Sequence, residues 1–348
     1  MKAIHIANKI VSERHPTFII AEAGVNHNGQ LKLAKKLIDA AILAGADAVK
    51  FQTYKAEEVV TKKAELAEYA KTNSGKNITQ LQMIKKMELT YKDFQILKKY
   101  CDTKGIIFLS TPHSFDAIDF LEKIVPAYKF GSGDLTNTPA LQHAAKKGKP
   151  MILGTGMATL QEVKHAVNVI KSEKNTQIIL LHCTTSYPCP LEEVNLRSML
   201  TMKKELKCLI GYSDHTLGIL VPALAVTLGA TVIEKHFTLD RKLPGPDHKA
   251  SLEPDELKQM IVEIRNTEKI LGSYIKKPTA SEKKLIKQVR KSVVSNQDIQ
   301  KGTVIKKHML SIKRPGTGLH PEKLPTFIGK KAKQTIKKDE ILQNHMVE

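Results

Sequence analysis

The feature that most constrains the fold is a repeat of short apolar strands and amphipathic helices between residues 17 and 237. Alternation at this spacing predicts a parallel sheet. Eight such units within about 220 residues favour a closed (β/α)8 TIM barrel of the α/β class, with a doubly wound open sheet as the alternative. The strands are predicted at residues 18–22, 48–52, 106–110, 127–131, 151–155, 178–183, 209–213 and 231–236, and helices between them at residues 31–44, 94–104, 115–123, 160–170 and 218–228.

The chain beyond the predicted barrel has a different character. A helix at residues 254–271 should pack against the outside of the barrel, and residues 276–284 have the composition of a linker. The last residues hold short β-like runs and turn signals, which predict a small β-rich domain. We therefore predict a barrel domain at residues 1–273, a linker at 274–287 and a β-rich domain at 288–348.

Composition and charge narrow the possible partners. No apolar run approaches the ~18 residues that span a bilayer, and the first residues lack an apolar secretory core, so we expect a cytoplasmic protein without a membrane partner. The four cysteines lack metal-site spacing, which favours reduced thiols. Residues 273–348 hold 18 Lys/Arg against 6 Asp/Glu, or +12 of the formal +20. Because few aromatics separate these lysines, a lysine-rich proteome or an anionic substrate is favoured over nucleic acid.

Nearly every predicted strand ends in a side chain that can take part in chemistry. The C-terminal strand ends of a barrel form its active site, so these side chains should meet there. Strand residues alternate between two faces, which places Lys50 with Gln52 and Glu234 with His236. The strand-end groups are Glu22, Lys50, Gln52, Ser110, Thr111, Lys129, Ser132, Asp134, Thr155, Thr184, Thr185, Tyr187, Ser213, His215, Glu234 and His236.

Two histidines, His215 and His236, follow the seventh and eighth strands. A single histidine is more often structural than a ligand, but neutral imidazoles on neighbouring strand ends can share one divalent ion. Two protein ligands leave coordination positions open, which favours a catalytic metal over a structural one. Mn²⁺, Mg²⁺ and Co²⁺ all suit such a site.

Two lysines, Lys50 and Lys129, enter the same predicted barrel mouth, where an anion would offset their repulsion. A ligand with a phosphate and a carboxylate fits this requirement. Glu22 beside a metal and two cations would be ionised. It could act as a general base or accept a hydrogen bond from a substrate hydroxyl. The hydroxyls that could complete an anion site are those of Thr111, Ser132 and Ser213.

Loops outside the strands offer further polar groups. Residues 55–89 form a long excursion that is either a lid or a structural insertion. Asp247 lies in a Pro-Gly-Pro-Asp loop and Arg314 in a loop rich in glycine and proline. Together with Asn73 and Tyr187, these residues would suit a polyhydroxylated partner that carries an amide.

The predicted site residues of the barrel lie in the motifs Glu22-Ala-Gly-Val-Asn-His-Asn-Gly29, Lys50-Phe-Gln52, Ser110-Thr-Pro112, Lys129-Phe-Gly-Ser-Gly133, Gly154-Thr-Gly-Met157, Gly211-Tyr-Ser-Asp-His215, Glu234-Lys-His236 and Pro244-Gly-Pro-Asp247. The tail contains Asp298-Ile-Gln-Lys-Gly302 and Lys313-Arg-Pro315. Together the barrel motifs resemble the sialic acid synthases, or N-acylneuraminate synthases, a family that includes the legionaminic acid synthases, and the tail resembles their antifreeze-like SAF domain, which has a β-clip fold.

The resemblance implies a transferase that condenses phosphoenolpyruvate with an open-chain N-acylmannosamine-type sugar. The products are a nonulosonic (sialic-type) acid and phosphate, formed by C–O cleavage. We expect an N-acetylneuraminate synthase, and the alternative is a legionaminic or pseudaminic acid synthase that uses a 6-deoxy diacetamido hexose. A barrel of the 3-deoxy-octulosonate phosphate type, which takes phosphosugars, is a further enzymatic candidate, and a binder of anions or polymers through the basic tail is a non-enzymatic one.

The resemblance also assigns roles to residues. His215 and His236 would hold a divalent ion, expected to be Mn²⁺, and Glu22 would be the acid/base residue. Phosphoenolpyruvate would contact Lys50, Thr111, Lys129, Ser132 and Ser213. Gly154 stands where the family usually has serine, so we expect either Thr155 or backbone N–H groups to compensate for the missing hydroxyl. The sugar would contact Gln52, Asn73, Asp134, Tyr187, Asp247 and Arg314, the last from the partner subunit of a homodimer with swapped C-terminal domains.

Overall fold

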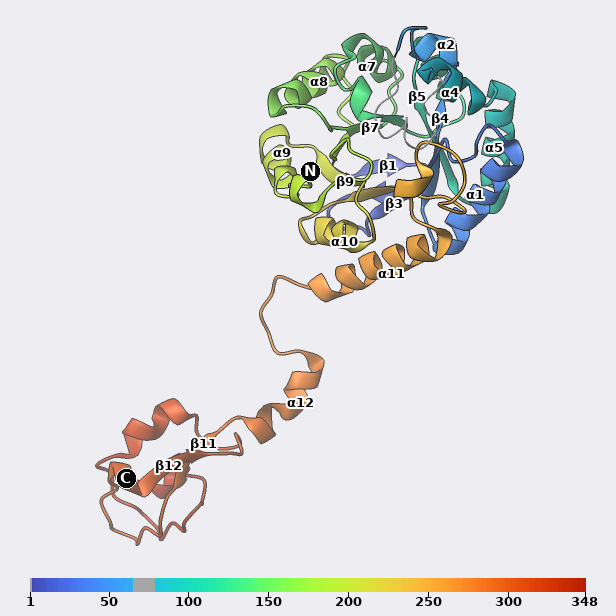
Figure 1. Cartoon of the computed structure of the whole chain (residues 1–348). Coiled ribbons are helices and arrows are strands. Elements are labelled where there is room, and N and C mark those ends of the chain that lie inside the picture. Colours follow the sequence, from blue (N-terminus) through green and yellow to red (C-terminus); the bar gives the residue numbers. More distant parts are fainter. Residues whose placement is uncertain (1, 65–78) are drawn as a thin grey trace. The chain divides into compact units, whose positions relative to one another are not determined.

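Eight parallel strands form the centre of the first part of the chain in a computed structural model that describes residues 2–64 and 79–348 (Figure 1). Their hydrogen-bonded order is β5-β4-β3-β10-β9-β8-β7-β6. The two end strands, β5 and β6, contact each other and so complete a near-barrel. This confirms the predicted (β/α)8 architecture and excludes the doubly wound sheet. The strands are β3 (Phe18–Gly24), β4 (Ala48–Thr53), β5 (Ile107–Pro112), β6 (Tyr128–Phe130), β7 (Met151–Gly154), β8 (Ile178–His182), β9 (Leu209–Asp214) and β10 (Val232–His236).

Helices surround these strands (Figure 1). Several begin at side-chain caps: Thr90 and Thr159 both form capping boxes with the residue three positions on. Others end where glycine adopts the left-handed conformation, as at Gly45 and Gly105. The helices are α1 (Leu31–Ala44), α2 (Ala56–Val59), α4 (Gln80–Lys86), α5 (Tyr91–Lys104), α6 (Phe115–Glu122), α7 (Thr138–Ala145), α8 (Leu160–Ser172), α9 (Ser198–Leu206), α10 (Leu220–Thr227) and α11 (Pro254–Leu271).

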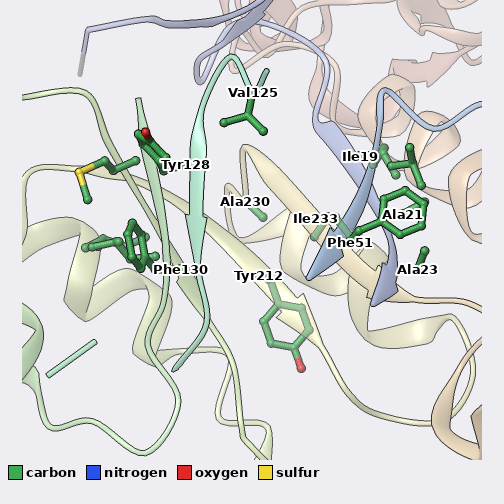
Figure 2. Close-up of a cluster of buried hydrophobic side chains, with 14 of the residues drawn as sticks. Ile19, Ala21, Ala23, Phe51, Val125, Tyr128, Phe130, Tyr212, Ala230 and Ile233 are labelled. Carbon is green, nitrogen blue, oxygen red and sulfur yellow. The ribbon is translucent and has the colours of Figure 1, made fainter. Parts of the chain in front are cut away.

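Alternation along the strands divides the buried apolar side chains into two clusters. Figure 2 shows Ile19, Ala21 and Ala23 along β3, with Phe51 of the neighbouring β4 beside them. These residues belong to the larger cluster, which also holds the buried faces of the surrounding helices. The intervening residues, such as Phe18 and Ile20, belong to a separate cluster built from the strands. They therefore face the barrel interior, and Glu22 is the next interior position along β3.

A hairpin that was not predicted from the sequence precedes the barrel. It pairs β1 (Ile4–Ile6) with β2 (Lys9–Val11) in antiparallel register. Its buried residues Ile4, Ile6 and Val11 join the interior cluster. Because this cluster also includes Phe18 and Val232 at the starts of their strands, the hairpin closes the N-terminal end of the barrel. The opposite end is left for the site.

The second compact unit, Ser273–Glu348, has its own core. It contains α12 (Ala280–Val289), β11 (Ser292–Ser295) and β12 (Leu310–Lys313), and the two strands pair antiparallel. Helix α12 runs through most of the stretch predicted as a linker, because Thr279 and Glu282 form a capping box that starts a helix there. Of the helices in the described ranges, none is long and apolar enough to cross a membrane.

Candidate active site

A cavity of about 280 Å³ lies at the C-terminal strand ends of the barrel. It takes side chains from most strands and from the loops that follow them, as expected for the catalytic end of such a barrel. The predicted site residues that line it are Glu22, Lys50, Gln52, Thr111, Lys129, Ser132, Tyr187, Ser213, His215, His236 and Asp247.

Two lysines and two glutamates form a buried charged cluster in this cavity. The Lys50 ammonium lies 2.8 Å from Glu22 Oε2 and 3.9 Å from Glu234 Oε2. The Lys129 ammonium lies 3.2 Å from Glu234 Oε1. All four side chains are at least 95% buried. The lysines are thus balanced in part by the protein's own carboxylates, and Glu234, which had no predicted role, pairs with both.

The two glutamates of this cluster have opposite pKa shifts. Burial raises the pKa of Glu22 to about 7, against the opposing effect of Lys50. Burial would also raise the pKa of Glu234, but Lys129 and Lys50 together lower it to about 2. Glu234 is therefore a fixed anion, whereas Glu22 is poised to exchange a proton near neutral pH. The Gln52 amide donates to Glu22 Oε1 at 3.4 Å and helps to orient it.

Hydroxyl groups surround the charged cluster. Thr111 accepts a hydrogen bond from the Lys50 ammonium at 3.0 Å, and Ser213 donates to Glu234 at 3.0 Å. The Ser132 hydroxyl accepts from the Gly156 N–H at 3.0 Å and lies 3.1 Å from the thiol sulfur of Cys183. These groups are already held in position before any ligand arrives.

The two histidines lie together at one side of the cavity, with ring centroids 5.6 Å apart. His215 Nδ1 lies 2.6 Å from the Thr184 carbonyl, so it carries the proton and leaves Nε2 with a free electron pair. His236 Nδ1 is buried without a hydrogen bond and lies 3.9 Å from Asp247 Oδ2. Burial lowers the pKa of both rings, which keeps them neutral.

This donor set fits a divalent metal, since neutral imidazoles with an available nitrogen are good ligands. Within residues 2–64 and 79–348, no group of three or more His, Cys, Asp or Glu side chains is arranged to hold an ion. A metal held by His215 and His236 would therefore take its other ligands from water or substrate. That is the open coordination expected of a catalytic ion.

A buried polar network that was not predicted from the sequence lies directly behind the histidines. The Lys235 ammonium pairs with Asp214 at 2.5 Å and donates to the Thr216 carbonyl at 2.5 Å. The Tyr212 hydroxyl also donates to Asp214, at 3.1 Å. Asp214 and Lys235 precede His215 and His236 in the chain, so their ion pair ties together the two strand ends that carry the imidazoles.

Three predicted site residues do not line this cavity. The Thr155 hydroxyl donates to the Leu181 carbonyl at 2.9 Å and does not line the cavity, so its position does not support the expected replacement of a serine hydroxyl. Asp134 lines a neighbouring cavity. Arg314 belongs to the second unit, where its guanidinium donates to the Val289 carbonyl at 3.1 Å. Asn73 lies outside the described residues.

Several lining residues had no predicted contact with a ligand. Gly154 lines the cavity, and a Cβ there would lie 3.0 Å from Ser132 Oγ. Cys183, interpreted from the sequence as an ordinary buried thiol, also lines it. Within the long segment at residues 55–89, helix α4 contributes Met83, Ile84 and Met87 as an apolar wall.

Known families and proteins match this chain over nearly its whole length. The NeuB family model matches residues 37–276, and the SAF domain model matches residues 290–348. The chain is 47% identical to an N,N'-diacetyllegionaminic acid synthase of Legionella pneumophila, over 92% of this chain and 91% of that protein. It is also 47% identical to a protein of the same name from Campylobacter jejuni, over 94% and 99%. A solved structure of an N-acetylneuraminic acid synthetase from Leptospira borgpetersenii is 39% identical, with a TM-score of 0.74 over 82% of this chain and 95% of that one.

Proposed function

The chain belongs to the NeuB family and ends in a SAF domain, and from this premise we propose that it condenses phosphoenolpyruvate with a 6-deoxy diacetamido hexose. The family relationship makes it a nonulosonic acid synthase. The names of two relatives at 47% identity favour N,N'-diacetyllegionaminic acid as the product over N-acetylneuraminate, the product expected from the sequence. The observation that carries the proposal is the Lys50–Glu22–Glu234–Lys129 cluster beside two neutral histidines in one cavity.

Lys50 and Lys129 supply the positive charge that binds phosphoenolpyruvate. Their ammonium groups lie in a buried site, where a phosphate or carboxylate interacts with them more strongly than it would in water. The hydroxyls of Thr111, Ser132 and Ser213 stand around them and complete the anion site. Because Glu234 remains ionised and pairs with Lys129, it fixes the position of that lysine.

His215 and His236 would hold the divalent ion, for which we propose Mn²⁺. When bound, such an ion supplies Lewis-acid polarisation of the sugar aldehyde. The residues themselves contribute orientation: the Thr184 carbonyl fixes the tautomer of His215, and the Asp214–Lys235 pair holds the two strand ends together.

Glu22 is the residue that moves a proton. C3 of phosphoenolpyruvate attacks the aldehyde carbon, water adds at C2, and the tetrahedral adduct loses phosphate by C–O cleavage. Glu22 accepts the proton of the added water. A pKa of about 7 suits this role, because the carboxylate is available at neutral pH and is a stronger base than an exposed glutamate.

The proposal is tested by phosphate release from phosphoenolpyruvate with a 6-deoxy diacetamido hexose, N-acetylmannosamine and a 6-phosphorylated sugar as separate acceptors. We expect the diacetamido sugar to give the highest kcat/KM. His215→Ala and His236→Ala should abolish this activity, whereas His165→Ala, at an exposed position on α8, should leave it unchanged. Full activity in both site variants and after chelation would exclude the metal role, and preference for the phosphosugar would exclude the proposed reaction.

We also propose that the sugar is contacted by Arg314 from a partner subunit, in a homodimer with swapped C-terminal domains. The proposal rests on the resemblance in the tail and on the presence of the SAF domain. Arg314→Ala should raise KM for the sugar more than KM for phosphoenolpyruvate. Assayed at a sugar concentration far below its raised KM, Arg314→Ala should recover activity when it is mixed and refolded with an inactive Glu22→Gln variant, because swapping produces one intact site. Failure to recover any activity would contradict the swap.

A further inference from the structure

A second cavity, of about 190 Å³, lies beside the candidate active site and shares His113 with it. We propose that this side cavity binds the acetamido group of the sugar that lies farther from the aldehyde, and that His113 and Asp134 select for it. The inference rests on the proposed function and specifies how the same site recognises its substrate class.

The position of the side cavity suits the far end of an acceptor sugar. His113 follows β5, whereas His215 follows β9 and His236 ends β10. In the strand order β5-β4-β3-β10-β9, β5 is separated from β9 by three strands, about half of the barrel circumference. For its remote acetamido group to reach the side cavity, a sugar whose aldehyde lies at His215 and His236 would extend across the mouth toward His113.

The walls of the side cavity combine apolar and polar groups. Apolar contacts are available from Pro112, Phe115, Ile118, Phe130 and Ala140. The polar lining residues are Glu58, His113, Ser114, Asp134 and Asn137. The volume is well above the ~10–15 Å³ that one water needs, so the cavity can accept a small organic group. An acetamido group has the same combination, with a methyl for the apolar wall and an amide for the polar groups.

The hydrogen-bonding partners in the side cavity match an amide. His113 Nδ1 lies 3.5 Å from Asp134 Oδ2, and the Asn137 amide donates to Asp134 Oδ1 at 3.3 Å. Although burial opposes it, the contact with His113 lowers the pKa of Asp134, so this carboxylate is ionised and can only accept. It is placed to accept an acetamido N–H, while the amide N–H of Asn137 that does not bond Asp134 can donate to the acetamido carbonyl.

A hydroxyl in place of the acetamido group would satisfy Asp134 but would leave the apolar wall uncovered and the Asn137 donor unused. A missing methyl or methylene in an apolar pocket changes specificity by about 10–200-fold. The side cavity therefore favours a diacetamido sugar over N-acetylmannosamine, which has a hydroxyl at the remote carbons.

Two variants test this assignment through the ratio of kcat/KM for the two sugars. His113→Phe keeps a ring beside Tyr54, which contacts His113 with centroids 6.0 Å apart, but removes the nitrogen that faces Asp134. Ala140→Leu fills the side cavity. Each should lower kcat/KM for the diacetamido sugar by about tenfold or more, with a change of about threefold or less for N-acetylmannosamine. Thr138→Leu is the matched control, because it lies on the same helix but lines a different cavity.

The outcomes separate this inference from the function on which it rests. If the wild-type enzyme turns over the diacetamido sugar but both variants change the two sugars equally, the side cavity has no role in selection and the inference is wrong. If the wild type turns over neither sugar with phosphoenolpyruvate and Mn²⁺, the proposed function fails and the inference fails with it. Thermal unfolding identifies a variant that does not fold, and His113→Phe, at a partly exposed position, then decides the question without Ala140→Leu.

Discussion

The two halves of the barrel interior are built from the same strands but differ in chemistry. Toward the N-terminal ends the interior positions are apolar, as at Ile20 and Val232, and the β1–β2 hairpin covers them. One interior position further along, the same strands present Glu22 and Glu234, which are buried beside lysines. Residues that stabilise the fold and residues that can do chemistry are therefore separated along each strand. Substitutions in the half of the interior at the N-terminal strand ends (the lower half) should affect the free energy of unfolding. Those in the half at the C-terminal strand ends (the upper half) should affect turnover.

The largest expected effect is on turnover, from Glu22→Gln. Loss of the proton acceptor should lower kcat by about 10²–10⁴-fold, the usual contribution of general acid–base catalysis. The amide keeps the shape of the side chain, so the circular dichroism spectrum should not change. Glu192→Gln, at an exposed position, is the control. A variant with more than half of the wild-type kcat would show that Glu22 does not transfer the proton.

The next effect concerns the ion pair behind the histidines. Lys235→Met leaves the buried Asp214 carboxylate without its partner and should cost about 3–5 kcal/mol of unfolding free energy. The double variant Asp214→Asn/Lys235→Met should lose less, because no buried charge is left uncompensated. Lys258→Met, on the exposed face of α11, is the control in urea unfolding. Equal losses in the single and double variants would contradict the pairing.

In the lower half, Ile20→Ala should cost about 2–5 kcal/mol of unfolding free energy, since it leaves a cavity in the barrel interior. The kcat of the folded enzyme at 25 °C should remain within about twofold of wild type. Ile270→Ala, whose side chain is 82% exposed, is the control for stability. A large loss of kcat in Ile20→Ala, without unfolding, would break the proposed separation between the two halves.

The smallest effect is the pH dependence of kcat/KM. Glu22 must be ionised to accept a proton, and burial raises its pKa to about 7. Activity should therefore fall as the pH drops through about 7, by about tenfold per pH unit at lower pH. The measurement is kcat/KM from pH 5 to 9 with saturating Mn²⁺. A profile that stays flat down to pH 5 would show that Glu22 has an ordinary carboxylate pKa.

The features that could be predicted from the sequence are those that depend on a single strand or helix. Strand–helix alternation placed all eight barrel strands, and the polar residues at strand ends identified most of the cavity lining. Such patterns are local, so they can be read without knowing which strands are neighbours. The resemblance to the sialic acid synthases is confirmed by the family comparison, while the roles that it implies for residues such as Glu22 and Lys50 stay predictions.

Features that depend on residues distant in the chain could not be predicted. The pairing of Glu234 with Lys129 requires β6 and β10 to face each other across the barrel. The contact of Cys183 with Ser132 likewise joins the ends of two different strands. The β1–β2 hairpin was not predicted because each strand has only three residues, too few for a clear alternation. Helix α12 begins within a lysine-rich stretch that resembles a linker, although Thr279 and Glu282 signal its start.

We propose that the charged upper half of the barrel interior carries out a condensation with C–O cleavage. Which bond breaks is tested with phosphoenolpyruvate labelled with ¹⁸O in the oxygen that bridges C2 and phosphorus, together with a 6-deoxy diacetamido hexose. We predict that the released phosphate carries the label and that the nonulosonic acid takes its C2 oxygen from water. Label retained in the acid, with unlabelled phosphate, would mean that the P–O bond breaks and would contradict the account.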